Sequence, residues 1–118
     1  MKVDTNQALA LTFEQIHTEA TAAATAAATR FLKERMGGRD SYPCGFVWVT
    51  VDVAGNTRLG RKMKELKFKK PAVGRGLQLW NPSGLPVQNM DAKFHGAVAY
   101  ASVLAKYGIE AIAEDRLD

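Results

Sequence analysis

Segments with the patterns of helices and strands alternate along the chain, and this alternation restricts the fold more than any other feature of the sequence. The order is a helix over 5–36, a strand over 44–52, a short helix capped by Asn56 or Thr57 and ending near Lys67, a strand over 76–80, a helix over 90–107 and a strand over 109–113. Strands that alternate with helices are typical of crossover connections, which make neighbouring strands parallel. We therefore expect an α/β fold, with a long N-terminal helix followed by a small three-stranded β-α-β-α-β sandwich that has a mostly parallel sheet.

The first predicted helix carries apolar or small residues at spacings of three and four positions, the pattern of an amphipathic helix. The residues of this expected buried stripe are Leu9, Phe13, Ile16, Ala20, Ala23, Ala27 and Phe31. Gly37 and Gly38 supply the left-handed conformation that commonly ends a helix. Two beginnings fit the sequence, because Asp4 or Thr5 could cap the helix and the segment 12–15 also has the residues of a capping box.

The length of this helix raises a packing problem in a chain of 118 residues, which has room for one domain. A helix over 5–36 is about 48 Å long, whereas a compact chain of this size is roughly 35 Å across. Either the helix breaks, or its Ala/Thr-rich middle, 20–29, packs on another copy of the chain. We expect a single domain over 1–118, in which 1–38 forms a helix that assembles a homo-oligomer and 44–118 forms the α/β core.

The strand predicted over 44–52 is the clearest in the sequence. β-Branched and aromatic residues fill both of its faces, which favours a central strand covered on both sides. We expect Trp48, inside this strand, to belong to the core. Trp80 ends the alternating strand 76–80, and the pattern leaves it open between a core residue and an exposed ring on which a base could stack.

The net charge of +4 is unevenly distributed along the chain. Eight Lys and Arg residues and one acid, Glu65, lie between Arg58 and Arg75, so that this stretch carries +7 and the remainder −3. A local excess of cations fits the binding of phosphate groups. The same residues also fit a solvated helix face, because Lys and Arg are common on any protein surface. Gly74 and Gly76 do not match a phosphate-binding glycine loop, because they lead into a strand, whereas such loops lie at the N-terminus of a helix.

The sequence offers few residues for catalysis or metal binding. The single cysteine, Cys44, cannot form an intrachain disulfide or a four-cysteine zinc site, and it indicates a reducing compartment. Glu14 and His17 have a spacing used in di-iron bundles, but the further carboxylates and the second copy of the motif are missing. Asp91 and His95 lie four residues apart on one helix, which favours an ordinary surface contact, with an acid/base pair as the alternative. We expect no metal and no cofactor, and we favour a non-enzymatic protein.

The loop from Trp80 to Asn89 places amides and a hydroxyl between a strand end and a helix start. In parallel sheets, ligands collect at the carboxyl ends of strands. Turn and capping chemistry explains most residues of this loop but not Gln88, which is therefore a candidate ligand residue. The helix that begins at Met90 could receive an anion, in competition with Asp91 in its first turn.

Part of the sequence resembles small proteins encoded by tailed bacteriophages. The resemblance lies in the segment Cys-Gly-Phe-Val-Trp-Val over 44–49, in an Ala-rich helix that follows it in the chain, and in the ending from Gly108 to Arg-Leu-Asp. The resemblance covers about 44–118 and leaves the N-terminal helix unmatched. It implies a phage origin and a location in the host cytoplasm, but no mechanism. The shared terminus makes Arg116 and Asp118 candidate contacts with a ligand or partner, and a frayed terminus is the alternative.

These patterns together predict a small, non-enzymatic protein that binds a phosphate-bearing ligand, a nucleotide or a nucleic acid. The resemblance implies in addition a protein of phage type that acts on host defence or replication. The alternative is a structural or interaction protein that assembles through its N-terminal helix, with the basic residues as a solvated face. Because no stretch is apolar enough for a membrane span and no signal peptide is visible, we expect a cytoplasmic protein with no membrane partner. The candidate ligand-binding residues are Arg58, Arg61, Lys62, Lys69, Lys70, Arg75, Trp80, Gln88 and Arg116.

Overall fold

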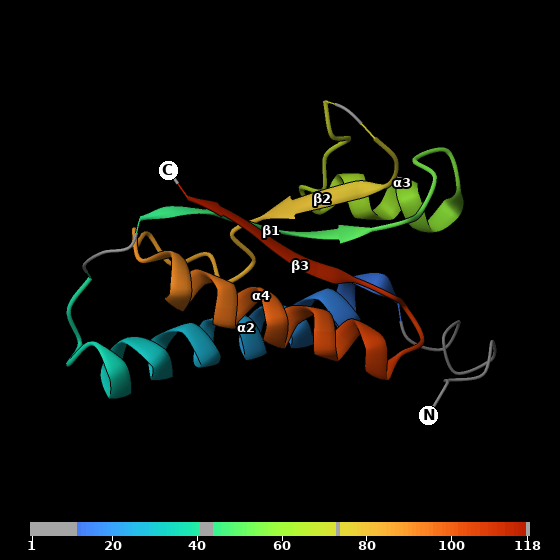
Figure 1. Cartoon of the computed structure of the whole chain (residues 1–118). Coiled ribbons are helices and arrows are strands. Elements are labelled where there is room, and N and C mark those ends of the chain that lie inside the picture. Colours follow the sequence, from blue (N-terminus) through green and yellow to red (C-terminus); the bar gives the residue numbers. More distant parts are fainter. Residues whose placement is uncertain (1–11, 41–43, 73, 118) are drawn as a thin grey trace.

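The computed structural model of the chain describes residues 12–40, 44–72 and 74–117. Its elements are helix α2 (Phe13–Arg35), strand β1 (Gly45–Val51), helix α3 (Arg58–Glu65), strand β2 (Leu77–Trp80), helix α4 (Met90–Lys106) and strand β3 (Ile112–Leu117). Helices α2 and α4 lie side by side along one face of the sheet (Figure 1). The predicted helical residues before 12 and the candidate contact Asp118 lie outside the described residues.

The predicted parallel sheet is wrong. The strands are arranged in the order β2-β1-β3, and β1 pairs antiparallel with both of its neighbours. The two outer strands therefore run in the same direction, opposite to β1. The connection through α4 does join two parallel strands, as helical crossovers do, but β1 lies between them.

A strand is inserted in the same way into the connection that contains α3. The chain returns along the sheet at Lys69, which forms an antiparallel bridge with Gln78 on the side of β2 that faces away from β1. The chain then reverses between Lys70 and Gly76, and β2 enters the sheet between Lys69 and β1. Both predicted helical connections are therefore present, but an inserted strand makes each adjacent pair in the described sheet antiparallel.

Helix α2 begins at the capping box, one of the two starts that fit the sequence. The backbone N–H of Gln15 donates to Thr12 Oγ1 at 3.2 Å, and the backbone N–H of Thr12 donates to Gln15 Oε1 at 3.0 Å. With 23 residues, α2 is about 35 Å long. This described helix is short enough to pack along α4 without a long overhang.

Small side chains bring α2 close to α4. Ala20, Ala24 and Ala28 are fully buried. A Cβ atom on Gly96 of α4 would lie only 3.0 Å from the backbone oxygen of Ala24, so the two helices approach closely at this point. The Ala/Thr-rich segment thus makes a contact within the chain, and its expected role in assembling copies of the chain stays a prediction.

The hydrophobic core lies between the helices and the sheet. Val47, Val49 and Val51 of β1 are buried in it, and Tyr100 and Phe68 are its largest fully buried side chains. These valines occupy every second position of β1, and successive residues of a strand point to opposite faces. The intervening residues of β1 therefore point away from the core.

Helices α2 and α4 lie along one face of the described sheet (Figure 1), and α3 contributes Met63 to the same core from beside β2. Strand β1 is central, as expected, but the expectation that both of its faces are covered is wrong. Phe46 is exposed, and Trp48 and Thr50 are partly exposed, between buried neighbours. The expectation that Trp48 belongs to the core is therefore wrong as well.

The last strand lies further along the chain than the sequence predicts. Strand β3 spans Ile112–Leu117 and not 109–113, and Arg116, for which a frayed terminus was the alternative, pairs with β1. Charged residues are common in edge strands, where they discourage pairing with other chains. Because β3 pairs with β1, Arg116 has a fixed place in the sheet, opposite Phe46.

Candidate functional site

The exposed side of the sheet, called the outer face below, is assembled by the strand register. Residues that lie opposite each other in adjacent strands share one face of the sheet. The outer face carries Phe46 opposite Arg116, Trp48 between Trp80 and Glu114, and Thr50 between Gln78 and Ile112. Each described strand contributes at least two of these residues.

Three aromatic side chains meet on the outer face. The rings of Trp48 and Trp80 are stacked, with centroids 4.8 Å apart and planes at 26°, and Phe46 meets Trp80 edge-on at 6.0 Å. Phe46 and Trp80 are 40% and 44% exposed, so Trp80 is the exposed ring and not a core residue. The indole N–H of Trp48 is buried without a hydrogen-bond partner in the described chain. This cluster therefore offers ring surface, and exposed apolar clusters of this kind commonly mark binding sites.

Charged groups border the aromatic cluster. The guanidinium of Arg116 lies over the ring of Phe46, 5.3 Å from its centroid, at the distance of a cation–π contact. The carboxylate of Glu114 accepts a hydrogen bond from the Thr50 hydroxyl at 2.6 Å. At the opposite edge, Lys69 pairs with the middle of β2 and extends the outer face beyond that strand.

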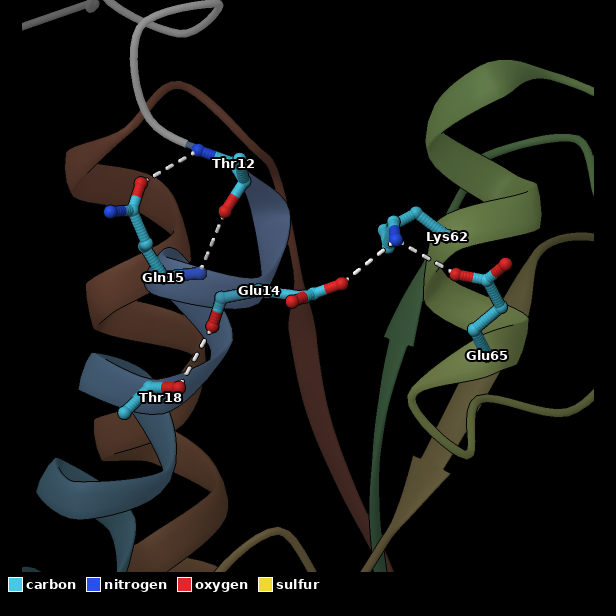
Figure 2. Close-up of polar contacts among 6 residues, drawn as sticks. All are labelled: Thr12, Glu14, Gln15, Thr18, Lys62 and Glu65. Atoms are coloured by element: carbon cyan, nitrogen blue, oxygen red, sulfur yellow. Dashed lines mark hydrogen bonds and ion pairs between the residues drawn. The ribbon is translucent and has the colours of Figure 1, made fainter.

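Lys62, a predicted ligand residue, is engaged in ion pairs. Its Nζ lies 2.8 Å from Glu14 Oε1 on α2 and 2.8 Å from Glu65 Oε2 on its own helix (Figure 2). Hydrogen bonds to both carboxylates raise the pKa of Lys62, and the ammonium in turn lowers the pKa of Glu14. A phosphate would have to displace two carboxylates, so we place Lys62 at the junction of α2 and α3 and not in the ligand site.

The remaining predicted cations lie outside the three strands of the outer face. Arg61 donates from Nη1 to a backbone oxygen of the loop before α3 at 3.0 Å, and Arg58 is exposed at the first position of α3. Lys70 and Arg75 line a separate hollow of about 650 Å³ at the end of β1. There Arg75 lies 3.6 Å from the carboxylate of Asp52.

Gln88 lies at the beginning of α4, where its side chain contacts Cys44 with an Sγ to Oε1 distance of 3.5 Å. The backbone N–H groups of Gln88 and Asn89 donate to the carboxylate of Asp40 at 2.9 to 3.0 Å. Asp40 therefore occupies the place at which an anion could approach the helix that begins at Met90. No sequence pattern indicates this contact, because Asp40 lies 48 residues before Gln88.

The two histidines have different surroundings. His95 is exposed, its ring centroid lies 4.6 Å from that of Phe31, and no hydrogen bond joins it to Asp91 in the part of the chain that the structure describes. The geometry thus gives no support to an acid/base pair of Asp91 and His95. His17 is partly buried, and its Nδ1 lies 2.6 Å from the hydroxyl oxygen of Tyr100. Burial lowers the pKa of His17 and raises that of Tyr100.

The lowered pKa of His17 predicts a pH-dependent stability. The unfolded chain binds the His17 proton more tightly than the folded chain, so this stabilisation is complete above the ordinary pKa of 6.5 and is lost as the pH falls through the lowered value. We expect urea denaturation to give a smaller free energy of unfolding at about pH 5.5 than at about pH 7.5, because histidine titrates within this pH range. His17→Gln should reduce this difference and His95→Gln should preserve it. An unchanged pH dependence in His17→Gln would contradict the assignment.

Three searches over the described residues and the sequence gave no result. No group of three or more candidate metal ligands gathers among residues 12–40, 44–72 and 74–117. None of the described helices is long and apolar enough to cross a membrane. Comparisons with known protein families, with curated proteins and with solved structures find no match. Function therefore has to be inferred from the chemistry of the outer face.

Sequence reasoning missed Phe46, Trp48 and Glu114 as members of this site. A signal for the first two was present, because they alternate with the valines of β1 in the period-two pattern of a strand with one open face. Glu114 had no comparable signal, since its place depends on where β3 begins.

Proposed function

We propose that the outer face binds single-stranded nucleic acid, with bases stacked on Trp80, Trp48 and Phe46 and phosphates held by Arg116 and Lys69. The stacked pair Trp48 and Trp80 on an open sheet surface is the observation that carries this proposal. Sheets with exposed aromatic residues bind unpaired bases in known RNA-binding modules. Aromatic rings combined with Lys or Arg are a common means of holding single strands.

The exposed rings favour a single strand over a duplex, and the charges around them indicate where its phosphates lie. In a duplex the faces of the bases are covered by their neighbours, so only unpaired bases can stack on the aromatic cluster. Glu114 lies beside Trp48 on the outer face and repels phosphate. We therefore expect bases over the centre of the outer face and the phosphate backbone along its edges, where Arg116 and Lys69 lie.

The separation of the two cations favours a strand over a mononucleotide. Lys69 lies beyond β2 and Arg116 lies in β3, three strand spacings away in the order Lys69, β2, β1, β3. With strands about 4.8 Å apart, this separation is roughly 14 Å across the sheet. A chain of several nucleotides can contact both cations and the rings between them.

We extend the proposal to the setting that the resemblance to tailed-bacteriophage proteins implies. The single strand would then be met in a host cytoplasm, during host defence or replication. A homo-oligomer would place several outer faces along one strand and strengthen binding by multivalency.

Fluorescence anisotropy of a labelled single-stranded oligonucleotide tests the proposal through its salt dependence. Each phosphate contact contributes about 0.7 to the slope of log affinity against log salt concentration for single strands. We expect Arg116→Gln and Lys69→Gln each to weaken binding at low salt and to reduce that slope by roughly 0.7. Lys33→Gln changes an exposed cation in the last turn of α2 and is the matched control, for which we expect an unchanged slope. Equal slopes in all variants would contradict the assigned contacts.

A further inference from the structure

A second hollow, called the β2 pocket below, lies beside the outer face. Its volume is about 730 Å³, and it is enclosed by α2, by the C-terminal end of α3 and by β2 with the loop that follows it. This volume is within the range of pockets that hold small molecules. The lining residues that matter for a ligand are His17, Thr21, Lys67, Lys69, Trp80 and Asn81.

Two side chains of α2 bring unused hydrogen-bonding capacity to this pocket. Thr21 lines the pocket, and its hydroxyl oxygen is buried with no hydrogen-bond partner in the described chain, whereas buried polar atoms in folded proteins nearly always have one. A rotation of the side chain about χ1 is needed to bring this oxygen to a ligand in the pocket. His17 contacts Tyr100 through Nδ1, which leaves Nε2 for a ligand. The lowered pKa of His17 keeps the ring neutral at pH 7, so its two nitrogens comprise one donor and one acceptor.

The backbone of the β2 pocket is also unusual. Lys67 and Asn81 are the two non-glycine residues with a positive φ in the described chain, at 77° and 46°, and both line this pocket. The side chain of Asn81 holds its own loop by donating from Nδ2 to the backbone oxygen of Leu85 at 2.9 Å. The positive φ of Lys67 ends α3, where the N–H of Phe68 donates to the backbone oxygen of Met63 at 3.0 Å, as at many helix ends. That of Asn81 is maintained by the hydrogen bond within its own loop.

The β2 pocket is continuous with the outer face. Trp80 and Lys69 line the pocket and also belong to the outer face or to its edge. A strand whose bases stack on Trp80 therefore passes directly beside the pocket. Leu79 and Pro82 supply apolar lining against which the flat face of a base can lie.

We propose that the β2 pocket receives one base of the bound strand and distinguishes it by hydrogen bonds with Thr21 and His17, while Lys69 holds the adjacent phosphate. This inference rests on the proposed binding of a single strand to the outer face. Stacking alone tolerates every base, whereas a pocket with buried donors and acceptors favours the base whose edge satisfies them. The protein is then a single-strand binder with a preference for one base.

Fluorescence anisotropy with three homopolymers at one salt concentration tests this inference. The homopolymers are those of deoxythymidine, deoxycytidine and deoxyadenosine. We expect the wild-type protein to prefer one of the three. Thr21→Val keeps the shape of the side chain and removes only its oxygen, so it should reduce the preference by about three- to tenfold, the effect of one hydrogen bond. Because that oxygen has no partner in the described part of the free protein, we expect the variant to fold normally.

Thr29→Val on the exposed side of the same helix is the control and should retain the wild-type preference. Wild-type protein that binds all three homopolymers equally would overturn the inference, and so would a Thr21→Val variant with an undiminished preference. In both cases binding itself persists and the proposed function stands. Absence of binding to every homopolymer would instead overturn the proposed function together with the inference.

The imidazole NMR signals give a second readout that does not depend on affinity. The chain has two histidines, of which His17 lines the β2 pocket and His95 lies against Phe31. Addition of the preferred homopolymer should shift the ring signals of His17 and leave those of His95 in place. Saturating binding without a shift of the His17 signals would show that no base enters the pocket.

Discussion

Replacing Trp80 with alanine is expected to weaken the binding of a single-stranded oligonucleotide by about five- to 150-fold, because one base loses its stacking surface and such stacking contributes about 1–3 kcal/mol. Trp80 is the most exposed of the three rings on the outer face and also contacts both others. The measurement is an anisotropy titration at constant salt, accompanied by a thermal unfolding curve that shows the variant to be folded. Trp80→Phe should recover a large part of the affinity.

Val98 provides the matched control for this substitution. Its side chain is exposed to the same fraction as Trp80, 44%, but it lies on α4 and outside the outer face. Val98→Ala should leave the affinity unchanged. If Trp80→Ala binds as tightly as Val98→Ala, bases do not stack on the outer face.

Replacing Phe68 with alanine is expected to reduce the free energy of unfolding by about 3–5 kcal/mol, the cost of truncating a buried phenylalanine. Phe68 is 2% exposed, and its ring centroid lies 6.0 Å from that of Phe13, 6.4 Å from that of His17 and 6.3 Å from that of Tyr100. A domain of this size is commonly stable by about 5–15 kcal/mol, so the loss is a large share of the total. Urea denaturation followed by circular dichroism measures it.

Phe46 offers the opposite test with the same residue type. Its ring is 40% exposed and lies on the outer face. Phe46→Ala should change the free energy of unfolding far less than Phe68→Ala and should lower the affinity for a single strand. A large loss of stability with unchanged affinity would show that Phe46 is a structural residue.

The helices were largely predictable because their signals are local. The caps at Thr12, Thr57 and Asn89 each accept a hydrogen bond from the backbone N–H three residues further on, as residues of these types do at helix starts. The buried stripe of α2 was predicted less well. It continues through Ala24 and Ala28 and not through the expected Ala23 and Ala27, because α4 determines which small residues are covered.

The sheet was not predictable from the same patterns, because strand order and direction depend on contacts between distant segments. The rule for crossovers holds for β2, α4 and β3, but it does not say that β1 lies between the two parallel strands. The position of β3 was missed for a related reason. Its charged residues form a strand because β1 offers a free edge at that place, not because of their own propensity.

The candidate site was partly visible in the sequence. Trp80 and Arg116 were identified, although spacing alone could not show that they share one face of the sheet. The basic stretch separates in the structure, since Lys62 is paired with Glu14, which lies 48 residues away in the sequence, while Lys69 reaches the edge of the outer face. Aromatic residues from two strands form the centre of the site, and only the strand register brings them together.

Tryptophan fluorescence tests the central claim most directly, because the chain contains two tryptophans and both lie on the outer face. We predict that a single-stranded oligonucleotide changes the emission of the wild-type protein to a saturating value at low salt, and that a duplex of the same sequence has a much smaller effect. Anisotropy of the same labelled oligonucleotide reports binding independently. Saturable binding with unchanged tryptophan emission, or no binding at low salt, would contradict the assignment of the outer face as a surface for single-stranded nucleic acid.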